Sequence, residues 1–275
     1  MDRILNALGP AAFPLLWLSF FGLMMLAAAI GRAARARWTA EGSAKAGEEK
    51  DAQEDLVLSA SLGLLALLLG FTFSLAIDRF ESRRRLVLEE ANAIGTAYLR
   101  AQLLEEPHRA RMSGLLVRYT DTRIALAKAP PGKVRDLLRT NDALVTQIWI
   151  AVKQSFPTIK QYDFSSTYLD SINSMIDIGS ARVVARVARV PSAVLAVLLL
   201  YTLTTAAVLG YVLQGPRSRH VAGFLVALLS LVLVLIIDVN RPSAGLVREG
   251  QGAMESLRKT MDTWRPATFD APAPR

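Results

Sequence analysis

Four long stretches without a single charged side chain constrain what this chain can fold into more than any other feature. They are Phe13–Ile30, Leu56–Ile77, Val190–Leu213 and Val221–Ile237, in a chain of 275 residues of which 20% are charged. About 20 helical residues cross a hydrocarbon core about 30 Å thick, so each stretch can span a membrane once its flanks are counted. Backbone groups in lipid must bond within their own segment, which favours helices. The sequence predicts an all-α membrane protein with four transmembrane helices.

The segment between the second and third spans is the only one large enough to form an aqueous domain. Its periodicity is helical, and breaks are expected at Glu105–Pro107, Ala129–Gly132, Ser155–Pro157 and Val190–Pro191. We therefore divide the chain as follows: an N-terminal span and polar linker (1–55), a second span that continues into the next part (56–77), a helical aqueous domain (78–189), the third and fourth spans (190–239), and a C-terminal amphipathic helix and tail (240–275).

Composition removes most catalytic classes. There is no cysteine, and the two histidines, His108 and His220, have no base or nucleophile nearby in sequence, so we expect no enzyme, no metal site and no cofactor. The net charge of +8 would favour nucleic acid in a soluble protein. Beside four apolar spans it instead indicates basic flanks held at anionic membrane lipid, and no nucleic-acid-binding module is recognisable.

Two features of the topology stay open from the residues alone. The first span is either a retained anchor or a signal peptide that is cleaved near Ala27–Ala29; its apolar run is longer than a signal core, and only Arg3 precedes it, which favours the anchor. Basic residues are more numerous beside the termini and the central segment but denser in the short loops on the other side. The positive-inside rule therefore does not decide the orientation.

The second span and its continuation carry the most informative pattern. No proline interrupts Leu56–Glu106, so one helix about 75 Å long is expected to leave the bilayer. Its polar residues fall within an arc of about 80° on a helical wheel. The pore-lining candidates on this face are Phe71, Ser74, Asp78, Arg85, Glu89, Asn92, Thr96 and Arg100. Either several copies surround a water-filled path lined by this face, or the face is merely solvated.

Three further sets of residues offer alternatives. A row of bulky apolar side chains on the same helix, Phe73, Ile77 and Phe80, could form a hydrophobic neck in place of the polar face. Arg182, Arg186 and Arg189, just before the third span, would meet lipid headgroups or attract an anion. Asp78 and Asp238 each close a span, where an acid has a partner, faces water or lies at the headgroup level.

Several segments resemble the bacterial bestrophin-like family of unknown function, which is remotely similar to bestrophin chloride channels. The matching segments are Gly70–Ala76, Arg84–Arg85, Glu90–Arg100, Met175–Asp177 with Arg182 and Pro191, and Asp238 with Arg241, Pro242 and Gly245. The resemblance implies a pentamer with four membrane helices per subunit, with both termini and the helical central domain in the cytosol. It also places a hydrophobic neck on the second-span helix.

Together the residues and the resemblance favour a homo-oligomeric channel for ions, small anions in particular, in the bacterial inner (plasma) membrane. Its partners would be membrane lipid and further copies of the chain. The alternative is a membrane-anchored scaffold or signalling module, without a pore, whose helical domain binds a cytosolic partner. A secondary transporter is less well supported, because the halves show no inverted repeat of broken spans.

Overall fold

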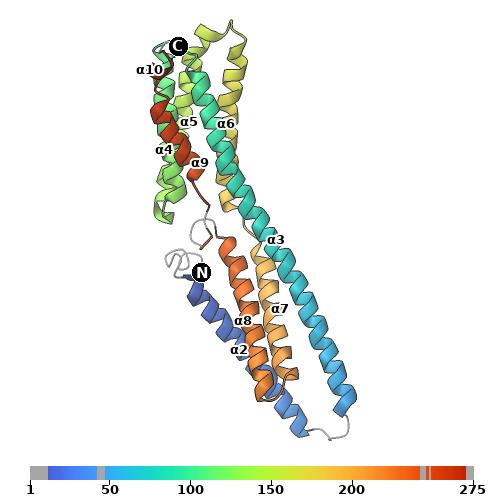
Figure 1. Cartoon of the computed structure of the whole chain (residues 1–275). Helices are drawn as coiled ribbons and strands as arrows, with labels where there is room; N and C mark the ends of the chain where they lie inside the picture. The colour runs from blue at the N-terminus through green and yellow to red at the C-terminus, as the bar shows by residue number, and fades with distance from the viewer. Residues whose placement is uncertain (1–11, 42–46, 242–245, 248, 271–275) are drawn as a thin grey trace, which may run out of the picture. The chain divides into compact units, whose positions relative to one another are not determined.

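The computed structural model describes residues 12–41, 47–241, 246–247 and 249–270. Within these ranges the regular structure is entirely helical, and four helical stretches are long and apolar enough to cross a membrane (Figure 1). The predicted fold class is confirmed. The chain forms two compact units: a membrane unit (residues 1–80 and 189–248) and an aqueous unit (residues 81–188 and 249–275).

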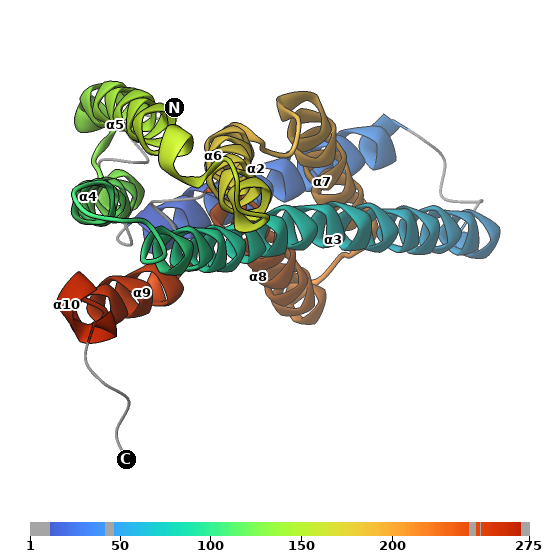
Figure 2. The ribbon, with the colours of Figure 1, turned by 90° about the horizontal axis from the view of Figure 1, so that it is seen from above.

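The membrane unit contains α2 (Ala12–Glu41), the first part of α3 (Gly47–Ala101), α7 (Ser192–Val212) and α8 (Pro216–Val239). Figure 2 shows α2 beside α7 and α8. Pro191 and Pro216 mark the starts of α7 and α8, where a missing N–H costs nothing. Gly215, with a φ of 88°, makes the turn between them in a backbone region that favours glycine.

Glycine allows α2 and α7 to approach each other at backbone distance. A Cβ built on Gly31 would lie 1.9 Å from the carbonyl oxygen of Ala207, and one on Gly210 would lie 1.9 Å from that of Ala28. Neither position can carry a side chain without separating the helices. Small residues that bring two backbones together are a common way to associate helices in lipid, where no hydrophobic force drives apolar surfaces together.

The aqueous unit contains the rest of α3, α4 (His108–Lys128), α5 (Pro131–Ile159), α6 (Phe164–Val187), α9 (Gly252–Thr263) and α10 (Pro266–Phe269). Four of these helices bury apolar rows with coiled-coil-like spacing, such as Met112, Leu116 and Tyr119 on α4, in one core. Met254 and Met261 of α9 lie in the same core. Residues 249–270, which the sequence assigned to a separate C-terminal amphipathic helix and tail, thus pack in this unit.

Helix boundaries follow the predicted breaks with one exception. The long helix is confirmed as α3, and the breaks near Pro107, Pro130 and Pro191 separate helices as expected. The break expected at Ser155–Pro157 lies a few residues further on, because α5 includes Pro157 and ends at Ile159. A proline so close to the end of a helix removes one hydrogen bond and leaves little helix beyond it to disrupt.

Candidate functional site

The membrane part of the polar face on α3 points away from the core of its unit. Ser74 and Asp78 are exposed in the protomer, and Phe71 is 66% exposed. On the opposite side of the helix, Leu69 and Ala76 are buried in the membrane unit. The polar side chains are therefore available to solvent, lipid or another subunit.

The same face continues in the aqueous unit. Arg85, Asn92 and Thr96 are exposed, and the half-exposed Glu89 accepts a salt bridge from the Arg85 Nε at 3.4 Å. Arg100 is partly withdrawn from the face, since its guanidinium donates a hydrogen bond to the backbone carbonyl of Thr167. The exposed groups thus alternate in sign along the helix, from Asp78 through Arg85 to Glu89.

A surface groove of about 470 Å³ runs beside this face within the aqueous unit, between α3 and α9. Its lining comes from α3 and from the C-terminal segment: Leu88, Ala91, Asn92, Gly95, Thr96, Leu99, Ala253, Ser256, Leu257, Thr260 and Trp264. Small residues on α3 permit the approach, because a Cβ on Gly95 would lie 3.2 Å from Leu257 Cδ1. Asn92 and Thr96 belong both to the polar face and to the groove.

The alternative apolar row lies on a different side of α3. Phe73, Ile77 and Phe80 are half-buried and pack against the core of the membrane unit, next to residues of the third and fourth spans. Within the protomer their side chains therefore already have apolar partners, whereas Ser74 and Asp78 are exposed.

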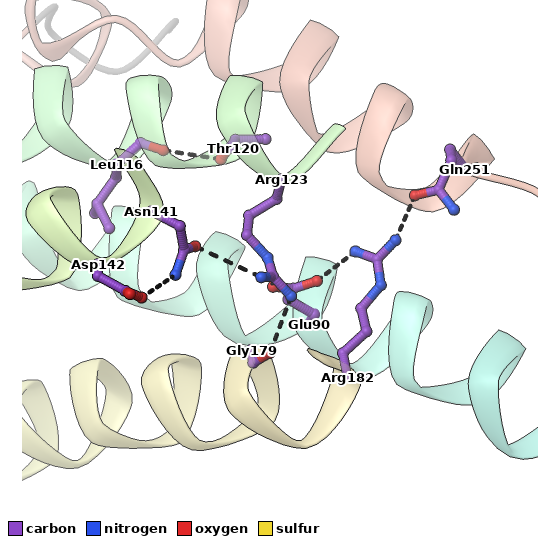
Figure 3. Close-up of polar contacts among 9 residues, drawn as sticks. All are labelled: Glu90, Leu116, Thr120, Arg123, Asn141, Asp142, Gly179, Arg182 and Gln251. Atoms are coloured by element: carbon purple, nitrogen blue, oxygen red, sulfur yellow. Dashed lines mark hydrogen bonds and ion pairs between the residues drawn. The ribbon is translucent and has the colours of Figure 1, made fainter. Parts of the chain in front are cut away.

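Sequence reasoning missed a buried ionic network in the aqueous unit (Figure 3). Glu90 is fully buried, and its carboxylate accepts hydrogen bonds from the Arg123 Nε at 2.5 Å and from Arg182. Arg123 also donates to the carbonyl of Gly179 at 3.0 Å, and Arg182 donates to the side chain of Gln251 at 2.6 Å. The Glu90 carboxylate thus joins α3, α4 and α6, and Arg182 extends the network to Gln251, which precedes α9.

The network contains two guanidinium groups and one carboxylate, so its formal charge is +1. Burying ions costs several kcal/mol each, and hydrogen bonds to every charged group are needed to offset that cost. The Asn141 side chain and the Gly179 carbonyl supply the extra acceptors for Arg123. The network therefore ties α3, α4 and α6 together within the aqueous unit, and loss of any one charged partner would leave another buried without its counterion.

Gly179 and Tyr119 pack directly against the carboxylate of this network. A Cβ on Gly179 would lie 2.4 Å from the Tyr119 hydroxyl and 3.3 Å from Glu90 Oε1, so only glycine leaves room for both groups. Burial raises the pKa of Tyr119 to about 12, an effect that Arg123 opposes and the Glu90 carboxylate reinforces. The hydroxyl therefore stays protonated at physiological pH.

The sequence did contain a signal for this network. Arg83, Val87, Glu90 and Ile94 follow the four-then-three spacing of an apolar row, and all four are buried. On α4, Arg123 follows Met112, Leu116 and Tyr119 in the same way, and on α6, Arg182 follows Tyr168, Ile172, Met175 and Gly179. A charged residue at a buried position of a largely apolar row predicts a buried partner of opposite charge.

The three arginines before the third span have different environments. The structure gives Arg182 a buried partner, Glu90, in place of the lipid or anion contact that the sequence suggested. Arg186 is half-buried and donates to the carbonyl of Leu126 at 2.5 Å, and burial lowers its pKa from the usual value. Arg189 is exposed.

Asp238 is a buried acceptor at the end of α8. Its Oδ2 accepts hydrogen bonds from the backbone N–H groups of Leu246 at 2.8 Å and Val247 at 3.2 Å. Nearby, Asn240 Oδ1 accepts from the N–H of Val190 at 2.8 Å. These side chains replace backbone partners where the chain turns after the fourth span; Pro242 and Gly245 lie outside the described residues. Among the described residues, no group of three His, Asp or Glu could hold a metal ion.

Comparison with known proteins places this arrangement in a family. The model of the bestrophin-like domain matches residues 22–248. A crystal structure of a bacterial bestrophin homologue from Klebsiella pneumoniae superposes with a TM-score of 0.66 at 16% identity, covering 93% of this chain and 99% of that one. A point variant of that homologue gives a TM-score of 0.68 at 16% identity, covering 90% and 97%.

At such low identity the likeness shows a shared fold. No curated protein sequence matches the chain. The family model covers most of the chain, including the last three spans and the intervening helices. The chain therefore belongs to the bestrophin-like family and is a multi-pass membrane protein.

Proposed function

We propose that the protein is a homo-oligomeric ion channel for small anions, in which α3 helices from several copies surround the conducting path. The observation that carries this proposal is the exposure of the polar face of α3 in both units. Asp78, Arg85 and Asn92 are exposed, whereas Ala76, Val87 and Ile94, on the other side of the same helix, are buried. A polar face in a span needs water or a polar partner, and an axis shared by several copies supplies both.

The family supports a channel, and the resemblance to bestrophins favours a pentamer. The aqueous unit and both termini would lie in the cytosol of a bacterium, with the spans in its inner membrane. Because the chain has no cysteine, single cysteines introduced at Gly132 and Gly47 report the orientation directly. An impermeant thiol reagent applied to intact cells should label the variant at Gly47 only. Labelling of the variant at Gly132 would show that the orientation is the opposite of the one proposed.

The test of conduction uses purified protein in liposomes with an anion-flux readout. Flux above that of empty liposomes is expected, and size measurement in detergent gives the number of subunits. No flux under variation of voltage, pH and calcium would contradict the channel. It would favour the alternative, a non-conducting scaffold, which the groove between α3 and α9 supports as a surface for a cytosolic partner.

The lining face is tested separately, by reversal potentials in asymmetric salt for Asp78→Ala and Phe73→Ala. A ring of carboxylates repels anions and attracts cations, so Asp78→Ala should shift the reversal potential towards greater anion selectivity. A shift confined to Phe73→Ala would favour the apolar row as the lining. A reversal potential that neither change affects would show that α3 does not line the conducting path.

A further inference from the structure

The chain passes between the membrane unit and the aqueous unit at three places. At or near each passage, one residue on the aqueous side takes part in a shared contact. Arg83 lies three residues after the passage in α3, Ala188 is the last residue before the second passage, and Glu249 is the first residue after the third. These positions are far apart in sequence. They belong to three different segments: α3, the end of α6, and the segment that precedes α9.

One side chain joins all three. The Arg83 Nε donates to Glu249 Oε1 at 2.5 Å, and its Nη1 lies 3.4 Å from the carbonyl oxygen of Ala188. The Arg83 side chain is 3% exposed and that of Glu249 is 13% exposed, so the ion pair is shielded from water. Shielding strengthens the attraction and makes the loss of one partner costly, because a buried charge would remain.

The two arms of this contact differ in kind. Ala188 offers a backbone carbonyl just after α6, which any residue at that position would also provide. Glu249 offers a charged side chain on a segment without regular structure, and two residues further on the same segment is also held through the contact of Gln251 with Arg182. Among its contacts, Arg83 therefore binds a backbone acceptor that does not depend on the residue at position 188 and a side chain that it binds through charge.

We propose that Arg83 is a clamp that holds together the three passages of the chain at the aqueous unit, with Glu249 as the partner that it binds through charge. Local opening of a segment is governed by the few contacts that retain it. Because Arg83 contacts all three segments, a displacement of one of them would also displace the other two.

Hydrogen exchange of the full-length protein in detergent tests this, with peptides that cover residues 185–190 and 249–258, the second of which includes the first backbone hydrogen bonds of α9. Arg83→Met should accelerate exchange about tenfold or more in both peptides, because both arms are lost. Glu249→Gln should accelerate exchange in residues 249–258 only, because the bond to Ala188 remains. Arg84→Met is the matched control, since Arg84 is the exposed neighbour of Arg83 and should leave both peptides unchanged.

Two results would overturn the clamp. Wild-type exchange in both peptides of Arg83→Met would show that other contacts hold the passages. Faster exchange throughout the aqueous unit, including the buried segment around Ile94, would show that Arg83 supports the whole core. The measurement does not involve ion flow, so its outcome is independent of the liposome test of the channel.

Discussion

Replacement of Glu90 by glutamine should be among the most destabilising conservative changes in the aqueous unit. Glutamine has nearly the same shape but no charge, so Arg123 and Arg182 would keep their buried positions without a counterion. Removing one partner of a buried ion pair costs about 3–5 kcal/mol. For a chain of this size each kcal/mol lowers the Tm by about 2–4 °C, which gives a decrease of roughly 6–20 °C.

The neighbouring residue supplies the matched control. Glu89 also pairs with an arginine, Arg85, but at 3.4 Å and with side chains that are 45% and 72% exposed. An exposed pair of this kind contributes about 0–1 kcal/mol, so Glu89→Gln should lower the Tm by about 4 °C at most. Both variants are compared by thermal unfolding in one detergent, followed by tryptophan fluorescence. Equal shifts for the two variants would refute the assigned role of the Glu90 network.

Three further changes test the packing. Gly31→Ala should destabilise the membrane unit by about 1–3 kcal/mol or more through its clash with Ala207, whereas Gly22→Ala, which has open space, should be neutral in the same thermal assay. Gly179→Ala should lower the Tm because its Cβ would displace the Tyr119 hydroxyl; an unchanged Tm would show that the network can relax. Burial raises the pKa of Tyr119 to about 12, above its usual value near 10. The contribution of its protonated hydroxyl to the free energy of unfolding is complete below pH 10 and should fall between pH 10 and 12, by about 1.4 kcal/mol per pH unit. Tyr119→Phe should flatten this part of the stability profile.

Local properties of the chain were enough to predict its class and much of its organisation. Hydropathy over about 20 residues located the four spans, because burial of a helix in lipid depends on the composition of that helix alone. Proline located the starts of α4, α5 and α7, since its missing N–H acts on the same segment. The resemblance carried by Glu90–Arg100 and its companions predicted the bestrophin-like family correctly.

The tertiary structure decided what depends on residues far apart in sequence. Glu90 is bound by arginines 33 and 92 residues away, and no local pattern tells which charges on three apolar rows will meet. The same holds for the approach of Gly31 to α7 and for the contact of Arg83 with Glu249. The period of a helix determines which face a residue occupies, but only the packing of helices determines what that face meets.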